Sequence, residues 1–246
     1  MSKIQFDLDG KRYFETGVSE GVLFVKAMPT DTNVEDVVNG HHHGVAWNGL
    51  TAVTQSPEGA EASDVYADNI KYLTLRGPEN LKATIEAYMY PQEFERCDGS
   101  ASLGDGVKIG QQKRIPFAFV YKTKKGNDED PDKGYIIHII YGCTASPSEK
   151  PYATVNDSPE AITFSWEIAA TPVKLEGFLP TCIVEIDSTK VASAKLTEIE
   201  NALYGKDAGT DPLTDPEIIS HLLMPSDIKA IMDRTNVKKS ASSTTK

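Results

Sequence analysis

Residues 81–90 constrain the fold more than any other stretch, because their side chains alternate strictly between apolar and polar types. The apolar set is Leu81, Ala83, Ile85, Ala87 and Met89, and the polar or aromatic set is Lys82, Thr84, Glu86 and Tyr88. A period of two is the pattern of a β-strand with one buried face, whereas a helix repeats every 3.6 residues. We therefore predict a strand whose first face packs in a core and whose second face is wet or lies in an interface.

Similar short runs, rich in β-branched and aromatic residues, continue to about residue 187 between Gly, Pro, Asn and Asp. They predict strands at 22–26, 45–54, 71–76, 115–122, 135–141, 162–169 and 182–187. Residues 4–8 and 12–14 flank Asp9-Gly10, a dipeptide suited to a type I′ turn, and predict an N-terminal hairpin. The even spacing of these strands favours a β-sandwich or barrel.

The pattern changes after residue 188. Ala192, Leu196, Ile199 and Leu203 recur at helical spacing and Gly205 follows, which predicts one amphipathic helix capped at its start by Ser188 or Thr189. Further short helical pieces are predicted from Asp215-Pro216-Glu217 and over residues 226–232. We expect one mainly β (α+β) domain over residues 1–234, β-rich in 1–187 and helical in 188–234, followed by a disordered polar tail at 235–246.

Charge and cysteine content exclude several classes of protein. The 246 residues carry 25 Lys and Arg against 36 Asp and Glu, a formal charge of -11, which argues against tight nucleic-acid binding through a basic surface. Cys97, Cys143 and Cys182 form no C-x-x-C pair, so neither a zinc site nor a disulfide framework is predicted. The alternating N-terminus does not read as a signal peptide, and no apolar run is long enough to span a bilayer. We expect synthesis in a cytoplasm and no membrane partner.

Short motifs with known chemistry are weak or broken. Residues 104–110 contain glycines resembling a dinucleotide loop, but in the wrong spacing. Asp128, Asp130 and Asp132 begin like a calcium loop, yet Lys133 occupies the glycine position, which favours an acidic hairpin tip. Residues 41–43 are three histidines, whose neighbouring side chains point to opposite faces of an extended chain, so a polar loop is favoured over a metal site. No metal, cofactor or catalytic site is predicted, although a spatial carboxylate pair has no local signature.

A longer series of segments is more specific than these motifs. In order, residues 13–23, 44–53, 57–61 and 66–72 are followed by 86–94, 97–99, 111–114, 134–138 and 164–167. Together they cover most of the chain to about residue 180, and the series resembles the major tail protein of long-tailed, non-contractile bacteriophages. Residues 222–227 match that family's C-terminal segment less well.

The resemblance implies a structural virion protein and not an enzyme. It implies a β-sandwich or barrel-like tail tube subunit with a flanking helix, which forms hexameric rings that stack into a hollow tube. Its partners would be itself, a tape-measure protein, a tail terminator and tail-tip proteins, with DNA only a transient passenger in the lumen. The protein would be made in the host bacterial cytoplasm and reside in the virion tail. An acidic lumen would repel phosphates and let DNA slide.

The segment at residues 55–69 is too long for a tight turn, and the resemblance makes it a candidate loop to a neighbouring subunit. Its candidate contact residues are Pro57, Glu58, Glu61, Asp64, Tyr66, Asp68 and Asn69. An ordinary surface loop is the alternative, and the histidine loop at 41–43 is a second candidate contact.

The alternative function is a β-sandwich carbohydrate-binding or adhesive virion module, in which Trp47, Trp166 and the tyrosines would form a sugar platform. The same aromatic residues would fill a core if the chain is a tube subunit.

Overall fold

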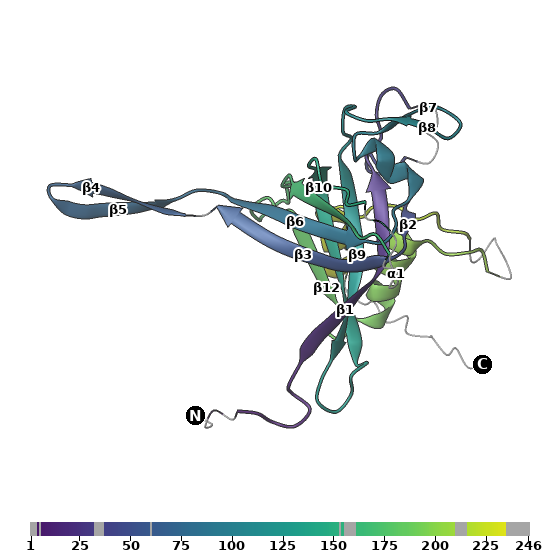
Figure 1. Ribbon diagram of the computed structural model, residues 1–246. Helices are drawn as coiled ribbons and strands as arrows, with labels where there is room; N and C mark the ends of the chain where they lie inside the picture. The colour runs from purple at the N-terminus through teal and green to yellow at the C-terminus, as the bar shows by residue number, and fades with distance from the viewer. Residues whose placement is uncertain are drawn as a thin grey trace, which may run out of the picture.

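The computed structural model describes residues 4, 6–31, 37–59, 61–152, 154, 161–209 and 216–234. Its main feature is one antiparallel sheet of eight strands in the order β2-β1-β9-β10-β11-β6-β3, with β12 also paired to β10 (Figure 1). These strands are β1 (Phe14–Val25), β2 (Val45–Trp47), β3 (Leu50–Gly59), β6 (Glu79–Ala87), β9 (Phe117–Gly126), β10 (Gly134–Ala145), β11 (Phe164–Ala170) and β12 (Ile183–Asp187). The predicted mainly β fold is confirmed.

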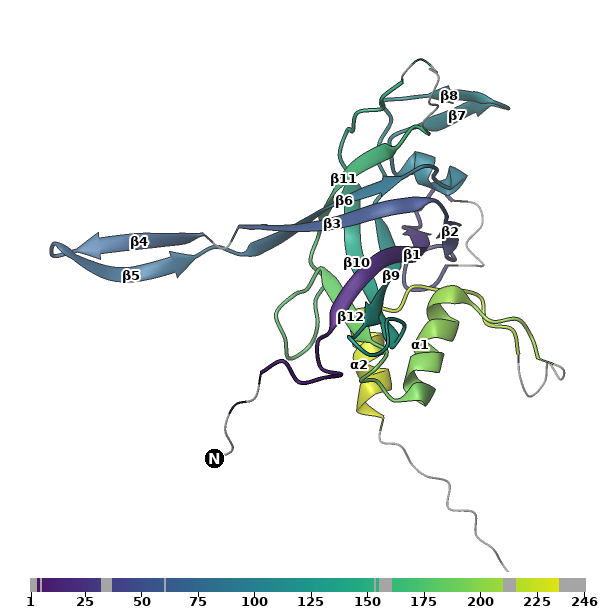
Figure 2. The same cartoon turned by 60° about the horizontal axis from the view of Figure 1, so that its bottom comes forward.

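The remaining elements are two separate hairpins and three helical pieces. The hairpins are β4 (Ala62–Ala67) with β5 (Ile70–Arg76), and β7 (Ala101–Gly104) with β8 (Val107–Ile109). A 3-10 turn, η1 (Gln92–Arg96), precedes β7, and the helices α1 (Ser193–Tyr204) and α2 (Pro225–Asp233) follow β12. Figure 2 shows both helices together on one side of the sheet.

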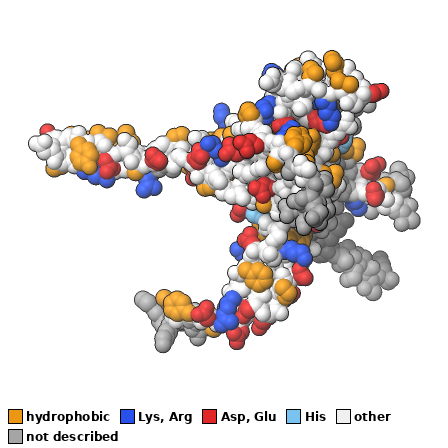
Figure 3. All heavy atoms as spheres, in the orientation of Figure 1, with side chains coloured by type: hydrophobic (Ala, Val, Ile, Leu, Met, Phe, Trp, Pro, Cys, Tyr) orange, Lys and Arg blue, Asp and Glu red, His pale blue; other side chains and the backbone are white. Residues whose placement is uncertain are grey.

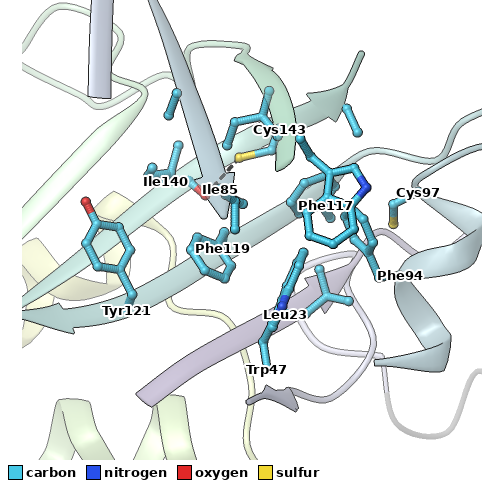
Figure 4. Close-up of a cluster of buried hydrophobic side chains, with 14 of the residues drawn as sticks. Leu23, Trp47, Ile85, Phe94, Cys97, Phe117, Phe119, Tyr121, Ile140 and Cys143 are labelled. Carbon is cyan, nitrogen blue, oxygen red and sulfur yellow. Dashed lines mark hydrogen bonds between the residues drawn. The ribbon is translucent and has the colours of Figure 1, made fainter. Parts of the chain in front are cut away.

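The sheet curls until its two ends approach each other. Trp47 lies on the edge strand β2, yet its ring centroid is 5.5 Å from that of Trp166 on β11 and 5.3 Å from that of Phe119 on β9. β2 and β3 occupy opposite ends of the strand order, yet only two residues, 48–49, connect them. This short connection holds the two ends of the sheet close together. The inside of the curl is filled by the cluster in Figure 4, which includes Ile85.

The central strands are buried on both faces. Along β1, Leu23 and Val25 point into the curl, whereas Val22 and Phe24 join a second core formed with the helices. Ile199 and Leu203 of α1 and Ile228 and Ile231 of α2 belong to that second core. A strand covered on both sides loses the alternation of a half-buried strand, which explains the continuous apolar run at residues 136–141.

The strand expected at residues 81–90 is confirmed over most of its length. Leu81, Ala83, Ile85 and Ala87 are buried in the curl, and Lys82 is exposed on the other face. The strand ends at Ala87, so Tyr88 and Met89 lie beyond it and are exposed, which corrects the placement of Met89 in the core.

Three other expectations about local structure are wrong: the N-terminal hairpin, the cap of α1 and the helix from residue 215. Residues 6–13 contain no strand; Gly10 has positive φ but Asp9 does not, and Lys11 N–H bonds to the Leu8 carbonyl at 3.1 Å, so the turn is not type I′. Helix α1 has Ala192 at its N-cap without a side-chain cap, because Ser188 instead bonds the Tyr135 amide.

The helix expected from residue 215 is absent at Pro216 and Glu217, and Ile218 instead pairs with Lys206. Asp215 and the tail at 235–246 lie outside the described residues. The helix over 226–232 is confirmed as α2, where the Asp227 carboxylate accepts a hydrogen bond from the Met224 amide at 2.9 Å. Residues 104–107 close the β7–β8 hairpin, and Asp128, Asp130 and Asp132 lie at the β9–β10 tip, as the sequence predicts.

Candidate assembly surface

A two-stranded arm projects from the body of the molecule (Figure 1). β3 and β6 remain paired as far as Gly59 and Glu79, and β4 and β5 continue outward as a separate hairpin. Nearly all of the arm's residues from 61 to 76 are exposed, and hydrophobic side chains recur along it (Figure 3). This arm corrects the predicted loop, since β3, β4 and the following turn take up almost all of residues 55–69.

The tip of the arm is a two-residue turn. Asp68 and Asn69 have φ of 51° and 62°, and they connect the paired residues Ala67 and Ile70. Positive φ at both central positions is the signature of a type I′ turn, which Asp and Asn tolerate better than other non-glycine residues. The dipeptide Asp68-Asn69 between two alternating runs was therefore the sequence signal for this hairpin, and a search limited to Asn-Gly and Asp-Gly overlooks it.

One face of the arm is polar. Asp64 pairs with Thr74 across the hairpin and accepts a hydrogen bond from its hydroxyl at 2.7 Å. Lys71, which is opposite Tyr66, places its ammonium 2.7 Å from the Asp64 carboxylate, and these contacts lower the pKa of Asp64. On this face, Asp64, Thr74 and Lys71 are therefore paired with one another.

The other face of the arm is apolar and uncovered. Directly opposed residues share a face, and the register pairs Val65 with Leu73, Ser63 with Leu75 and Ala67 with Ile70. Ile70 is 63% exposed and Leu75 57% exposed, and Leu73 and Val65 are also classed as exposed. We call Val65, Ile70, Leu73 and Leu75 the arm stripe. Leu73 and Leu75 lie in the strand predicted at residues 71–76, but the sequence does not predict that the stripe is uncovered by other described residues.

The predicted contact residues are distributed along this arm. Pro57 and Glu58 lie in β3, Glu61 follows it, Asp64 and Tyr66 lie in β4, and Asp68 and Asn69 form the tip. Their part in contacts between subunits stays a prediction.

The outward faces of β3, β6 and β11 form a polar wall. Thr84 is opposite Thr54 on one side and Glu167 on the other, and Glu86 is opposite Ser165. We define the polar wall as Thr54, Ser56, Glu58, Lys82, Thr84, Glu86, Ser165 and Glu167. The helices pack elsewhere on the sheet, with side chains of β1, β9, β10 and β12. Glu58 lies 2.9 Å from the Lys82 ammonium and raises the pKa of Lys82, so the wall carries three carboxylates and one ammonium.

The sheet has open edges at both ends. Among the described residues, β3 pairs only with β6, and β2 covers β1 only at residues 21–23, so residues 14–20 have a partner on one side alone. Pro57 lies in the edge strand β3, where a residue without an N–H is tolerated. Unpaired backbone groups on such edges are templates for pairing with another chain.

The three histidines at 41–43 do not converge on one point. His41 Nδ1 lies 3.0 Å from the Asn39 carbonyl, and burial lowers the pKa of His41. His42 Nε2 lies 2.9 Å from Asp31, a carboxylate that also binds Arg96 at 2.6 Å. In the part of the chain that the structure describes, no three His, Cys, Asp or Glu side chains are grouped to hold a metal ion.

The two tryptophans predicted for a sugar platform are buried. Trp47 and Trp166 are 2% and 1% exposed, so they fill the core and cannot form a sugar platform. The three cysteines are buried and unbonded, and burial raises the pKa of each thiol, that of Cys97 to about 12. Within the described ranges, no helix is both long and apolar enough to cross a membrane.

Comparison with known proteins gives only distant matches. No family model and no curated protein matches the chain. One similar solved structure is the sheath-tube complex of PVC, an extracellular contractile injection system, at 9% identity and a TM-score of 0.30, covering 75% of this chain and 94% of the other. Another is the sheath/tube terminator of the same system, at 10% identity and a TM-score of 0.28, covering 75% and 99%. Both TM-scores are too low to carry an argument about this chain.

Proposed function

We propose that this protein is a self-assembling structural subunit that forms stacked hexameric rings, the tail tube of a long-tailed bacteriophage. The observation that carries the proposal is the arm stripe. An isolated two-stranded hairpin is marginally stable in water, and this one has an apolar face that no other described residue covers. Such a face is stabilised when a partner covers it. In this proposal the partner is a second copy of the chain.

The open sheet edges support ring formation. The β3 edge of one subunit and the residue 14–20 edge of the next are different surfaces, so their pairing is heterologous and closes only when the rotation between subunits completes a circle. Sheet pairing around such a ring removes the exposed edges. The arm, which extends away from the body, would provide the second contact, toward the next ring.

The polar wall supports a role as the inner surface of the tube. Its short hydroxyl side chains and excess of carboxylates give a surface that repels phosphate and offers DNA no basic contacts to hold it. Genome passage into the host, with tape-measure, terminator and tip proteins as partners, is the biological role that follows from the family resemblance.

The deciding experiment removes the arm and keeps the body. Residues 60–78 are replaced by Asn-Gly, which joins the paired residues Gly59 and Glu79 through a two-residue hairpin turn. We expect the purified wild type to form rings or tubes by electron microscopy over a concentration series, and the shortened variant to stay a folded monomer. Light scattering gives the assembly mass, and circular dichroism checks the fold.

A matched control separates the apolar face from the polar face of the arm. Leu73→Ser with Leu75→Ser removes half of the arm stripe, whereas Asp64→Ser with Thr74→Ser changes the paired polar face. Assembly should be lost with the first pair and kept with the second. A wild type that stays monomeric at every concentration, or a shortened variant that assembles normally, would refute the proposal.

A further inference from the structure

A five-residue sheet edge lies beside a groove that is open to an added strand. β12 pairs with β10 on one side and ends the sheet there on the other. The Tyr141 amide bonds the Cys182 carbonyl and the Ser188 amide bonds the Tyr135 carbonyl. In an antiparallel ladder alternate residues are bonded, so Val184 and Ile186 face β10 and the backbone of Glu185 points outward.

Some backbone groups of this outer edge already have hydrogen-bond partners. The Thr181 hydroxyl bonds the backbone of Ile183, and the Asp187 carbonyl accepts from the amides of Lys190 and Val191. Among the described residues, the Glu185 N–H and C=O and the Asp187 N–H, at the centre of the edge, have no hydrogen-bond partner. They offer a short, defined place for strand addition.

The groove beside β12 has a volume of about 550 Å³. Its apolar lining comes from both the sheet and the helices, and includes Ile136, Val184, Ile186, Ile199, Ile228 and Met232. Charged residues, among them Glu15, Lys125 and Lys190, line the rest. A strand laid along β12 would therefore place one set of alternate side chains on apolar groups toward the helices and the other set on a charged rim.

The N-terminal segment has the matching pattern, and it pairs with no strand among the described residues. Ile4, Phe6 and Leu8 alternate with Gln5 and Asp7 in the sequence, as Val184 and Ile186 alternate with Glu185 and Asp187 in β12. Phe6 is 81% exposed, and Ile4 and Leu8 are also exposed. This is a strand sequence of the same length as β12, and it pairs with nothing within the described residues.

The segment is held at its base and directed outward. Gly10 and Arg12 donate their amides to the Asp128 carboxylate at 3.1 and 3.3 Å, and Asn127 Nδ2 donates to the Gly10 carbonyl at 2.8 Å. From this anchor the chain runs away from the body (Figure 1). The described residues of the segment, 4 and 6–8, do not line the groove of their own chain, which favours the groove of another copy.

We propose that the segment ending at Leu8 adds as a strand to the β12 edge of a second copy, with Phe6 and Leu8 in the groove between that copy's sheet and helices. The proposal rests on the self-assembly proposed above and names one contact within it. The C-terminal tail is a poorer occupant, since Val237 and Ala241 are its apolar residues in 235–246.

Cysteine cross-linking between separately made chains tests the proposal. Asp7→Cys and Glu185→Cys proteins are mixed under assembly conditions, oxidised and run on a non-reducing gel, because Asp7 alternates with Phe6 and its side chain would lie on the same face as that of Glu185. The native thiols are buried with raised pKa, so they compete poorly. A dimer band that appears only in the mixture supports the proposal. Asp7→Cys mixed with Glu198→Cys, on the exposed side of α1, is the control and should give no band.

Two results would overturn it. Wild-type tubes without a cross-link would refute this contact and leave the proposed function standing. A doubly substituted chain that links only within itself would show that the segment occupies its own groove.

A peptide of residues 1–9 gives a readout that needs no assembly. Added to isotope-labelled full-length protein, it should shift the amide resonances of Glu185 and Asp187. Replacing Phe6 and Leu8 of the peptide by Ser should weaken binding about tenfold or more for each side chain. Equal binding of the two peptides would contradict the proposal even if the protein forms no tubes.

Discussion

At the scale of single residues, Asp31 is a carboxylate that joins two separate segments of the chain. It accepts hydrogen bonds from the Met28 amide, His42 and Arg96, and so links the chain before β2 to η1. The Met28 amide, followed by His42, lowers the pKa of Asp31 from 3.8 to about 2. Its side chain is only 12% exposed, so these contacts are largely protected from water.

We predict that Asp31→Asn lowers the free energy of unfolding by about 1–2 kcal/mol at neutral pH. Because the pKa is lower in the folded state, the stabilisation is complete above the unfolded value near 3.8 and disappears as the pH falls toward 2. Urea unfolding across this range should show the two proteins converging in acid. Asp105→Asn, at the exposed β7–β8 turn, is the control and should match the wild type throughout.

At the scale of elements, α1 is held to the sheet by a few apolar side chains. Ile199 and Leu203 are fully buried, whereas Leu196 is only partly buried at the edge of the same core. We predict that Leu203→Ala lowers the free energy of unfolding by about 2–5 kcal/mol, through lost burial and the cavity left behind. Leu196→Ala should cost clearly less in the same urea titration. Equal losses would mean that α1 is not anchored through its buried residues.

Elements whose burial lies within the chain could be predicted from the sequence. Ala83 and Ile85 predict β6, and Ile199 and Leu203 predict α1, because each set packs in a core formed by the chain itself. The even spacing of the strands predicts a sandwich or barrel, but it does not predict which strands meet across the curl, since that depends on Trp47 meeting Trp166 across many intervening residues.

The errors at the candidate site have a common physical reason. Residues 4–8 have the alternation of a strand in the sequence, but residues 4 and 6–8 pair with no strand in the described part of the chain. The arm stripe likewise has apolar residues that no described core covers. A pattern search assumes that every apolar face is buried by its own chain. Where another copy is the partner, as we propose here, that assumption assigns a wrong hairpin at Asp9-Gly10. It also misses β4, the hairpin partner of the strand that the sequence correctly predicts at residues 71–76.

At the scale of the whole molecule, the polar wall, the helices and the arm occupy separate regions of the subunit. The polar wall faces away from the inside of the curl, over β3, β6 and β11, and the helices cover the other end of the same sheet face. The arm leaves the body from the β3 and β6 end. A subunit with this arrangement can turn one wall toward a central channel while the helices remain at a different radius.

The lumen proposal predicts that charge reversal on the polar wall makes the tube retain DNA. In Glu86→Lys with Glu167→Lys, the wall changes from three carboxylates and one ammonium to one carboxylate and three ammoniums, so phosphates would be attracted to it. We expect tubes assembled with short duplex DNA to protect it from nuclease, and the protection to fall steeply with added salt. Wild-type tubes should protect none.

The control reverses the same number of charges away from the wall, with Glu198→Lys in α1 and Glu217→Lys before α2. DNA bound by these tubes would lie outside and remain open to nuclease. Protection by the control equal to that of the wall variant would place the wall outside the channel. Loss of assembly in the wall variant alone would assign β6 and β11 to a subunit interface, because two new charges buried there would have no partners.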